Sequence, residues 1–237
     1  SLFFLCLFSR QEKKALNPIL DMALLHSRPF LAANLFNMII GAGVFGIFAF
    51  IPLYAVSVQK LTTMASGMIL TPRSIGTIFA SALTSFLIRR LGYRRPMLLG
   101  VLLIAVSTIL LSDQNFRLFQ LLGIHTGATG NLIILIMVTG IGLGILLPAS
   151  NNACIELMPE KVATITGLRG MFRSVGGICG ISTITIILHL SATLEQGFRT
   201  IFICFGFGLL LAIPLAFLMP SGRKRGIQQP PLEFTAK

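Results

Sequence analysis

The stretch LIRRLGYRRP, residues 87–96, carries four arginines within seven positions and lies between two apolar runs. The chain as a whole is 54% hydrophobic and only 11% charged, whereas soluble domains contain about 25% charged residues. A soluble fold of this size leaves a large part of its surface in water, so it has no room to hide so much apolar surface. The composition therefore predicts a membrane protein, and the arginines of this stretch mark a short loop between two membrane-spanning segments.

The apolar runs themselves predict the fold class. A helix needs about 20 apolar residues to cross the hydrocarbon core of a bilayer. The runs do not alternate between apolar and polar residues, and unpaired backbone groups are costly in lipid, so each crossing is expected to be a helix. The sequence predicts an all-α membrane protein that forms a six-transmembrane-helix bundle. We expect the spans near residues 30–57, 66–88, 96–112, 131–149, 166–190 and 198–219.

The segments on either side of the bundle differ from it in composition. Residues 1–29 open with the apolar run SLFFLCLF, and charged residues follow this run, which is the reverse of the order in a signal peptide. We interpret residues 1–29 as the end of a truncated helix plus a cytoplasmic linker, and the chain as a fragment. Residues 30–219 form the bundle, and residues 220–237 are expected to be a cytoplasmic tail.

Lysine and arginine are distributed unequally between alternate loops. Thirteen of them belong to one set of loops and ends: Arg10, Lys13, Lys14, Arg28, Arg89, Arg90, Arg94, Arg95, Lys161, Arg223, Lys224, Arg225 and Lys237. The other set holds only Lys60, Arg117 and Arg199. Because basic residues are retained on the cytoplasmic side of membrane proteins, we expect both ends of this chain and the stretch 87–96 in the cytoplasm.

Arg73 lies within the second expected span. It follows Pro72 about seven residues from the outer end of the span, which places it roughly 10 Å below the membrane surface at 1.5 Å per residue. An arginine inside a membrane costs at least a few kcal/mol unless it reaches water or a partner. Two interpretations stay open, in which Arg73 extends to the outer headgroups or faces a cavity.

Glycine is concentrated in the fourth and fifth spans. Gly140 and Gly144 are four residues apart, as are Gly176 and Gly180, and Gly177 lies beside the second pair. Small residues at this spacing let helices approach closely in lipid. The pattern is compatible with static packing and also with helices that bend or slide, as transporter helices do.

Several function classes lack their characteristic residues here. The cysteines and histidines are scattered, and no phosphate-binding loop, dinucleotide fingerprint or zinc-protease motif is present, so we expect no cofactor, no metal site and no enzyme. The basic residues are not interleaved with aromatic ones, so no nucleic-acid partner is expected. No Asp or Glu lies within any expected span, although an ion-coupled carrier needs such a group in its path.

The longer stretch SFLIRRLGYRRP, residues 85–96, resembles a motif of the major facilitator superfamily of transporters. The family repeats Gly-x-x-x-Asp-Arg-x-Gly-x-Arg-Arg in the cytoplasmic turn between the second and third helices of each half. The match covers Arg90, Gly92, Arg94 and Arg95, and the sequence departs from the motif at Ser85 and Arg89. The resemblance implies that Arg89, Arg90, Gly92, Arg94 and Arg95 form a cytoplasmic gate.

Three further stretches resemble the fourteen-helix drug:proton antiporter branch of this family. They are NPILDMALLHSRPF (17–30), IPLYAVSVQKLTTMASGMILTPRSIG (51–76) and GLRGMFRSVGGICG (167–180). The matching residues are Pro52, Leu53, Tyr54, Pro72, Arg73, Arg173, Gly176, Gly177 and Gly180. The resemblance implies one half of a major facilitator fold, the C-terminal one, with the N-terminal half missing. It assigns Arg173, with the glycines of the fourth and fifth spans, to helix packing and conformational change.

The function implied by this resemblance is proton-coupled efflux. The full protein would export drugs or other small amphipathic compounds across the bacterial inner membrane by alternating access, with its coupling acid in the missing half. Its partners would be the lipid bilayer, a small-molecule substrate and that other half. Candidate cavity residues are Phe45, Phe48, Tyr54 and Arg73, since aromatic rings attract cationic drugs whereas an arginine suits anions. The alternative is a non-transporting membrane scaffold or receptor.

Overall fold

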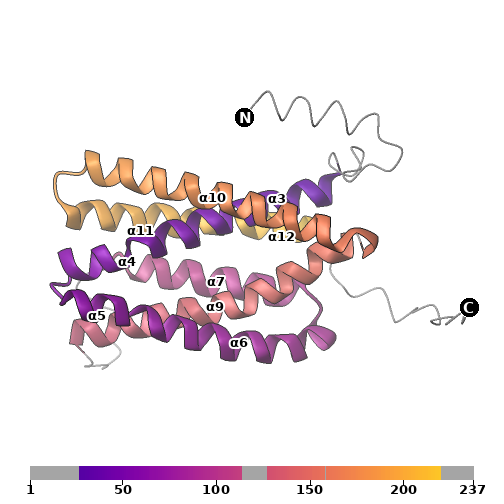
Figure 1. The fold of residues 1–237 in the computed structure, drawn as a ribbon, viewed down its shortest axis with the longest axis horizontal. Coiled ribbons are helices and arrows are strands. Elements are labelled where there is room, and N and C mark those ends of the chain that lie inside the picture. Colours follow the sequence, from indigo (N-terminus) through magenta and orange to yellow (C-terminus); the bar gives the residue numbers. More distant parts are fainter. Residues whose placement is uncertain (1–26, 114–126, 158, 220–237) are drawn as a thin grey trace, which may run out of the picture.

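The computed structural model describes residues 27–113, 127–157 and 159–219, and the described part is helical (Figure 1). The segments 1–26 and 220–237, which include most of the expected linker and the tail, lie outside the described residues. The elements are α3 (Arg28–Ile40), the π-helical turn η1 (Gly41–Phe45), α4 (Gly46–Ser57), α5 (Thr63–Met68), α6 (Leu70–Leu91), α7 (Arg94–Leu110), α9 (Gly127–Leu157), the 3-10 turn η2 (Pro159–Lys161), α10 (Val162–Leu190), α11 (Leu194–Leu210) and α12 (Ala212–Leu218).

The helices run roughly along the long axis of the molecule and reverse direction at each turn (Figure 1). The α6–α7 turn and the α9–α10 turn lie at one end, together with the start of α3 and the end of α12, and the α10–α11 turn lies at the other end. The stretch 87–96 and Lys161 are therefore separated from Lys60 and Arg199 by the length of the bundle, as the loop assignment requires. Which end faces the cytoplasm remains a prediction.

Four helical units are long and apolar enough to cross a membrane: Arg28–Ser57, Thr129–Leu157, Val162–Leu190 and Leu194–Leu218. They coincide with the first, fourth, fifth and sixth expected spans, although α9 continues through Pro148 to Leu157 and so passes the expected end at residue 149. The second and third expected spans are also helices. However, α6 carries three arginines, and α7 has 17 residues, fewer than the roughly 20 of a full crossing.

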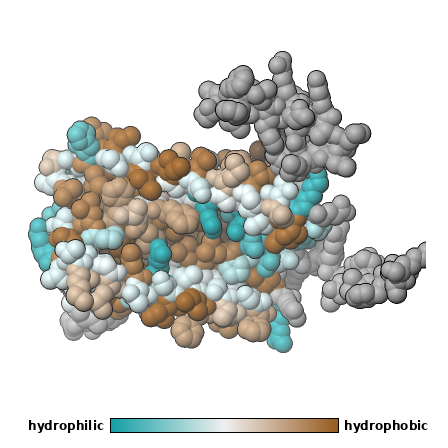
Figure 2. Space-filling model, viewed as in Figure 1, coloured by the Kyte–Doolittle hydropathy of each residue, from teal (hydrophilic) through white to brown (hydrophobic). Residues whose placement is uncertain are grey.

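The interior of the bundle contains two hydrophobic clusters. The first joins α3, α7, α9 and α12 around Phe36, Met97 and Leu146, and the second joins α4, α9 and α11 around Tyr54 and Phe202. Other large apolar side chains point outward, especially along α6 and α10. Figure 2 shows a largely hydrophobic face with polar patches across its middle, which suits a lipid surround better than water.

Glycine lets the backbones of α7 and α9 touch at Gly100 and Gly142, and it does the same in two further pairs of helices. In the first pair, α6 and α9, Gly140 lies against the carbonyl oxygen of Arg73. In the second pair, α10 with α3 and η1, Gly41 lies against the carbonyl oxygen of Arg173, and Gly176 against that of Met38. A Cβ atom at Gly140, Gly41 or Gly176 would overlap the facing carbonyl group. The close approach of each pair therefore depends on the absence of a side chain.

Gly144 and Gly180 extend these contacts by one turn. A Cβ on Gly144 would lie 2.5 Å from the carbonyl oxygen of Thr77, and one on Gly180 would overlap the carbonyl oxygen of Ala42. Gly177 instead faces a side chain, since its Cβ would lie 3.2 Å from the Cβ of Phe45. Each glycine pair thus contacts a single neighbouring helix along about one turn.

Candidate functional site

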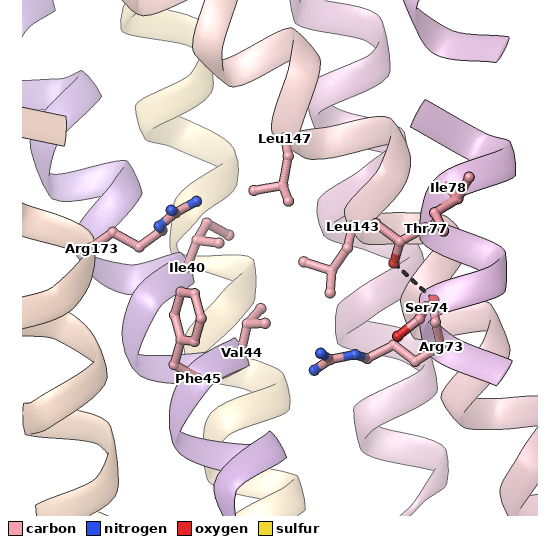
Figure 3. A pocket seen from close by; sticks show the side chains of 10 residues that line it. All are labelled: Ile40, Val44, Phe45, Arg73, Ser74, Thr77, Ile78, Leu143, Leu147 and Arg173. Atoms are coloured by element: carbon pink, nitrogen blue, oxygen red, sulfur yellow. Dashed lines mark hydrogen bonds between the residues drawn. The ribbon is translucent and has the colours of Figure 1, made fainter. Parts of the chain in front are cut away.

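A pocket of about 260 Å³ lies between two of the glycine-packed helix pairs. One wall comes from α3, η1 and α10, and the other from α6 and α9 (Figure 3). Ten residues line it: Ile40, Val44, Phe45, Arg73, Ser74, Thr77, Ile78, Leu143, Leu147 and Arg173. Phe45 is 49% exposed, so the pocket opens to the surface of the described bundle.

Arg73 projects into this pocket from the α6 wall (Figure 3). Its Cζ lies 4.3 Å from the centroid of the Phe48 ring, within the range of a cation–π contact. The Thr77 hydroxyl lies 2.8 Å from the carbonyl oxygen of Arg73 and 3.0 Å from that of Gly140, and it donates to these acceptors. Arg73 therefore lines a pocket of the described bundle, and a role of this pocket as the transport cavity stays a prediction.

Arg173 enters the pocket from the opposite wall, on α10 (Figure 3). Its Cζ lies 5.4 Å from the centroid of the Phe45 ring. The sequence analysis assigned Arg173 to helix packing, whereas its side chain lines the pocket. In the sequence, Arg173 lies four residues after Arg169, on the same helix face at the expected cytoplasmic start of the fifth span. That position is also compatible with a simple cytoplasmic anchor, so it does not by itself indicate a pocket.

The turn η1 sets the position of Phe45. Residues Gly41–Phe45 form a π-helical turn between α3 and α4, and such turns are rare and frequent at functional sites. A π-turn holds one residue more than an α-helical turn, so it shifts the side chains that follow it around the helix axis. The cluster Gly41, Gly43 and Gly46 is the only sequence signal for this irregularity, and the sequence analysis did not use it.

The two pocket guanidinium groups share one electrostatic property. Within the described ranges, the guanidinium groups of Arg73 and Arg173 have no hydrogen bond and no ion pair, and each lies over an aromatic ring. No acidic residue lines the pocket. The site therefore combines two positive charges with apolar walls.

Comparison with known proteins identifies the family. Residues 74–235 match the family model of the Major Facilitator Superfamily. The chain belongs to this superfamily. It is 28% identical over 75% of its length to the multidrug transporter protein MdtP of Bacillus subtilis. It is 27% identical over 73% of its length to the multidrug resistance protein B homolog of Mycobacterium tuberculosis, and 23% identical over 76% to the tetracenomycin C resistance and export protein of Streptomyces glaucescens.

The matched regions cover 31%, 31% and 32% of these three relatives, so the chain spans about a third of the length of the curated relatives it matches. The major facilitator superfamily consists of membrane transporters rather than enzymes, and the chain is related to multidrug efflux proteins. The fold, the family and the four apolar helices together make it part of a multi-pass membrane transporter.

Tyr54, which the sequence analysis placed at the cavity, lies elsewhere in this major facilitator bundle. The side chain is fully buried in the second hydrophobic cluster. Its ring makes edge contacts with Phe198 and Phe202, at centroid distances of 5.2 and 5.1 Å, and its hydroxyl accepts a hydrogen bond of 2.9 Å from Gln59 Nε2. Tyr54 is thus enclosed by packing against α11 and is not among the residues that line the pocket.

The turn between α6 and α7 is fixed by Gly92 and Arg94. Gly92 has a φ of 70°, a conformation that favours glycine, and its N–H closes α6 on the carbonyl oxygen of Ile88. Arg94 Nη2 donates to the carbonyl oxygens of Phe217 at 2.6 Å and Met219 at 3.3 Å. The turn is therefore bound to the end of α12, a contact 123 residues away in sequence that the motif alone did not indicate.

The remaining residues of this turn are less engaged. Arg90 and Arg95 are exposed, and the side chain of Arg89 lies outside the described residues. Burial raises the pKa of Tyr93, and the negative charge of Glu156 raises it further. Since Glu156 lies near the end of α9, the turn also approaches that helix, and the Tyr93 phenol stays neutral at physiological pH.

Proposed function

We propose that this chain is the C-terminal six-helix half of a secondary transporter that exports small amphipathic molecules. The observation that supports this most directly is the pocket between the two helix pairs, because it places charged side chains among apolar walls inside a bundle. Intramembrane charges face cavities or pathways in membrane proteins. In transporters built from repeated halves, the substrate binds near the bilayer midplane between those halves.

The transport cycle that we propose is alternating access. The α6–α9 pair and the α10–α3 pair each pack as a unit through glycine, and the pocket lies between them. In transporters built from two halves, one half rocks against the other around the binding site, so we propose that this bundle moves as one unit against the N-terminal half. Gly140, Gly144, Gly176, Gly177 and Gly180 are then packing residues that keep each pair together while the pocket changes.

Proton coupling and membrane orientation are part of this proposal. No Asp or Glu occurs in the expected spans, so we place the coupling carboxylate in the N-terminal half expected from the family resemblance. The basic turn with Arg89, Arg90, Gly92, Arg94 and Arg95 would lie at the cytoplasmic end, where it holds α12 in place and contributes to the inner gate. Both ends of the chain would then be cytoplasmic.

The test of transport is export of a fluorescent compound from cells that express the complete transporter containing this chain. We expect cells with the wild-type protein to retain less of the compound than vector controls, and collapse of the proton gradient to remove the difference. Equal retention by both kinds of cell across a panel of anionic, neutral and cationic compounds would favour the non-transporting scaffold or receptor instead.

The test of orientation uses single cysteines in a cysteine-free background. Thr129 and Arg95 are both exposed and lie at opposite ends of the bundle. Thr129→Cys should react with a membrane-impermeant maleimide in intact cells, and Arg95→Cys only after lysis. The opposite pattern would reverse the proposed orientation.

A further inference from the structure

We infer that Arg73 and Arg173 together bind the carboxylate of an amphipathic anionic substrate, whose apolar part lies on Val44, Leu143 and Leu147. This inference rests on the proposed transport function and adds the substrate class. It departs from the expectation that the aromatic residues of the cavity would attract cationic drugs.

The first argument is that the aromatic rings are already occupied. Arg73 lies over Phe48 and Arg173 over Phe45, at 4.3 and 5.4 Å from the ring centroids. A ring that stacks on a guanidinium group of the protein does not offer the same face to a cationic substrate. The positive charges of the two arginines also repel a cation in a site of low polarity.

The second argument is that the donors of both guanidinium groups are free. Each guanidinium group carries five N–H donors in a planar fork that matches a carboxylate. Within the ranges that the structure describes, none of these donors has a hydrogen-bond acceptor for either Arg73 or Arg173. An anion between the two walls would satisfy donors and reduce the repulsion between the two charges.

The third argument is that the backbone positions of both arginines are fixed. The carbonyl group of Arg73 lies against Gly140, and the carbonyl group of Arg173 lies against Gly41. The Arg73 carbonyl also accepts a hydrogen bond from the Thr77 hydroxyl. Two side chains that start from fixed points on opposite walls, and that rest on aromatic rings, lose little freedom when a ligand binds.

The shape and lining of the pocket define the rest of the ligand. Ile40, Val44, Ile78, Leu143 and Leu147 provide apolar surface beside the two charges. A volume of about 260 Å³ is slightly smaller than the pockets that enclose a drug-sized molecule, which begin at about 300 Å³. The described pocket therefore accommodates the carboxylate and part of an apolar body, and the remainder of the ligand projects through the open side.

A carboxylate could also come from an acidic side chain of the other half of the transporter. The experiment separates this source from a substrate by measuring binding of dansylglycine, a carboxylate, and dansylglycinamide, its neutral amide, to the purified complete transporter in detergent. Export of the same two compounds and of the cation ethidium from energised inside-out vesicles is measured in parallel.

We expect dansylglycine to bind at least tenfold more tightly than the amide. Arg73→Gln and Arg173→Gln should each weaken dansylglycine binding by about ten- to a hundredfold, because each removes a hydrogen bond between charged groups, and should leave the binding of the amide within about twofold. Arg73→Lys should retain part of the preference, because it keeps the charge and loses the fork. The matched control is Arg199→Gln, which removes an exposed arginine at the start of α11 and should change neither affinity.

Equal affinity of the wild-type protein for dansylglycine and its amide would overturn the inference, as would glutamine variants that weaken both ligands equally. Equal weakening of both ligands would mean that the arginines bind an acidic side chain of the protein instead of the substrate. Size-exclusion profiles of every variant separate these results from misfolding, and a variant that aggregates is replaced by its lysine counterpart.

Binding of dansylglycine with the expected preference but without export would support the anion site and contradict the transport function. Export of ethidium together with equal affinity for dansylglycine and its amide would support the transport function and contradict the anion site.

Discussion

Arginine has two different surroundings in this molecule. Arg94, in the turn between α6 and α7, donates to two backbone carbonyl groups of the last helix and lies over Phe217. The guanidinium groups of Arg73 and Arg173, in the pocket, lie over aromatic rings and have no hydrogen bond within the described ranges. The side chain of Arg94 joins the α6–α7 turn to the end of α12, whereas the guanidinium groups of Arg73 and Arg173 keep their N–H donors available. The same residue type therefore has a structural task at one place and, in our proposal, a ligand-binding task at the other.

The largest effect is expected at the glycine contacts between α10 and α3, which position Arg173. Gly176→Val would place a side chain against the carbonyl group of Met38 and separate α10 from α3. We expect this overpacking to lower the free energy of unfolding by about 3 kcal/mol. The measurement is thermal unfolding of the purified transporter in detergent. Unfolding is monitored by the reaction of cysteines with a thiol reagent, because this chain has no tryptophan to serve as a fluorescent probe.

The matched control for this change lies on the same helix. A Cβ at Gly170 would meet nothing within 4 Å, so Gly170→Val adds the same atoms without the overlap. If both variants lowered the unfolding temperature equally, the glycine contacts would have no part in positioning Arg173.

The next effect concerns the charge in the pocket. Arg73→Ala should reduce export by about ten- to a hundredfold, since it removes a hydrogen-bonded charge from the proposed site, and should leave the protein inserted. The rate of efflux is normalised to the amount of transporter in the membrane. Unchanged efflux would mean that Arg73 takes no part in transport.

A smaller effect is expected at the turn. Arg94→Ala removes both hydrogen bonds to the end of α12 and should cost about 1–2 kcal/mol of stability. Arg94→Lys should recover only part of this, because an ammonium group does not reproduce the planar geometry of the fork. Unfolding temperatures of Arg94→Ala and of Arg95→Ala, whose side chain is exposed, are compared. Equal values would mean that the turn needs only positive charge.

The smallest effect is expected at Thr77. Its hydroxyl bridges α6 and α9 by donating to the carbonyl groups of Arg73 and Gly140. Thr77→Val keeps the shape of the side chain and should cost about 1 kcal/mol. Thr185→Val, which removes a hydroxyl that bonds within its own exposed helix, is the control, and the difference between the two unfolding temperatures isolates the bond between helices.

Apolar runs predicted the helices because lipid demands long helices whose backbone groups are satisfied within the segment. The depth of Arg73 in the expected span left two positions open for its side chain, the outer headgroups and a cavity. Three features could not be predicted. The contact of Arg94 joins residues far apart in sequence, Tyr54 turns toward α11 through packing, and Arg173 enters the pocket because glycine brings α10 against η1. Each of these depends on how helices rotate against one another, which hydropathy does not specify.

The turn η1 gives the first helix of the bundle one residue more than a regular α-helix would hold in that segment. Each residue of an α-helix corresponds to about 100° of rotation, so a regular α-helix through the same residues would turn the half that carries Phe45 and Phe48 by about that angle relative to the half that carries Ile40. Deletion of one residue, for example Ala42, would remove the extra residue and the π-helical turn together, so both halves would keep the faces they present now. Loss of the turn without a deletion would instead take both aromatic rings away from Arg73 and Arg173. The turn itself is therefore what aims these two rings.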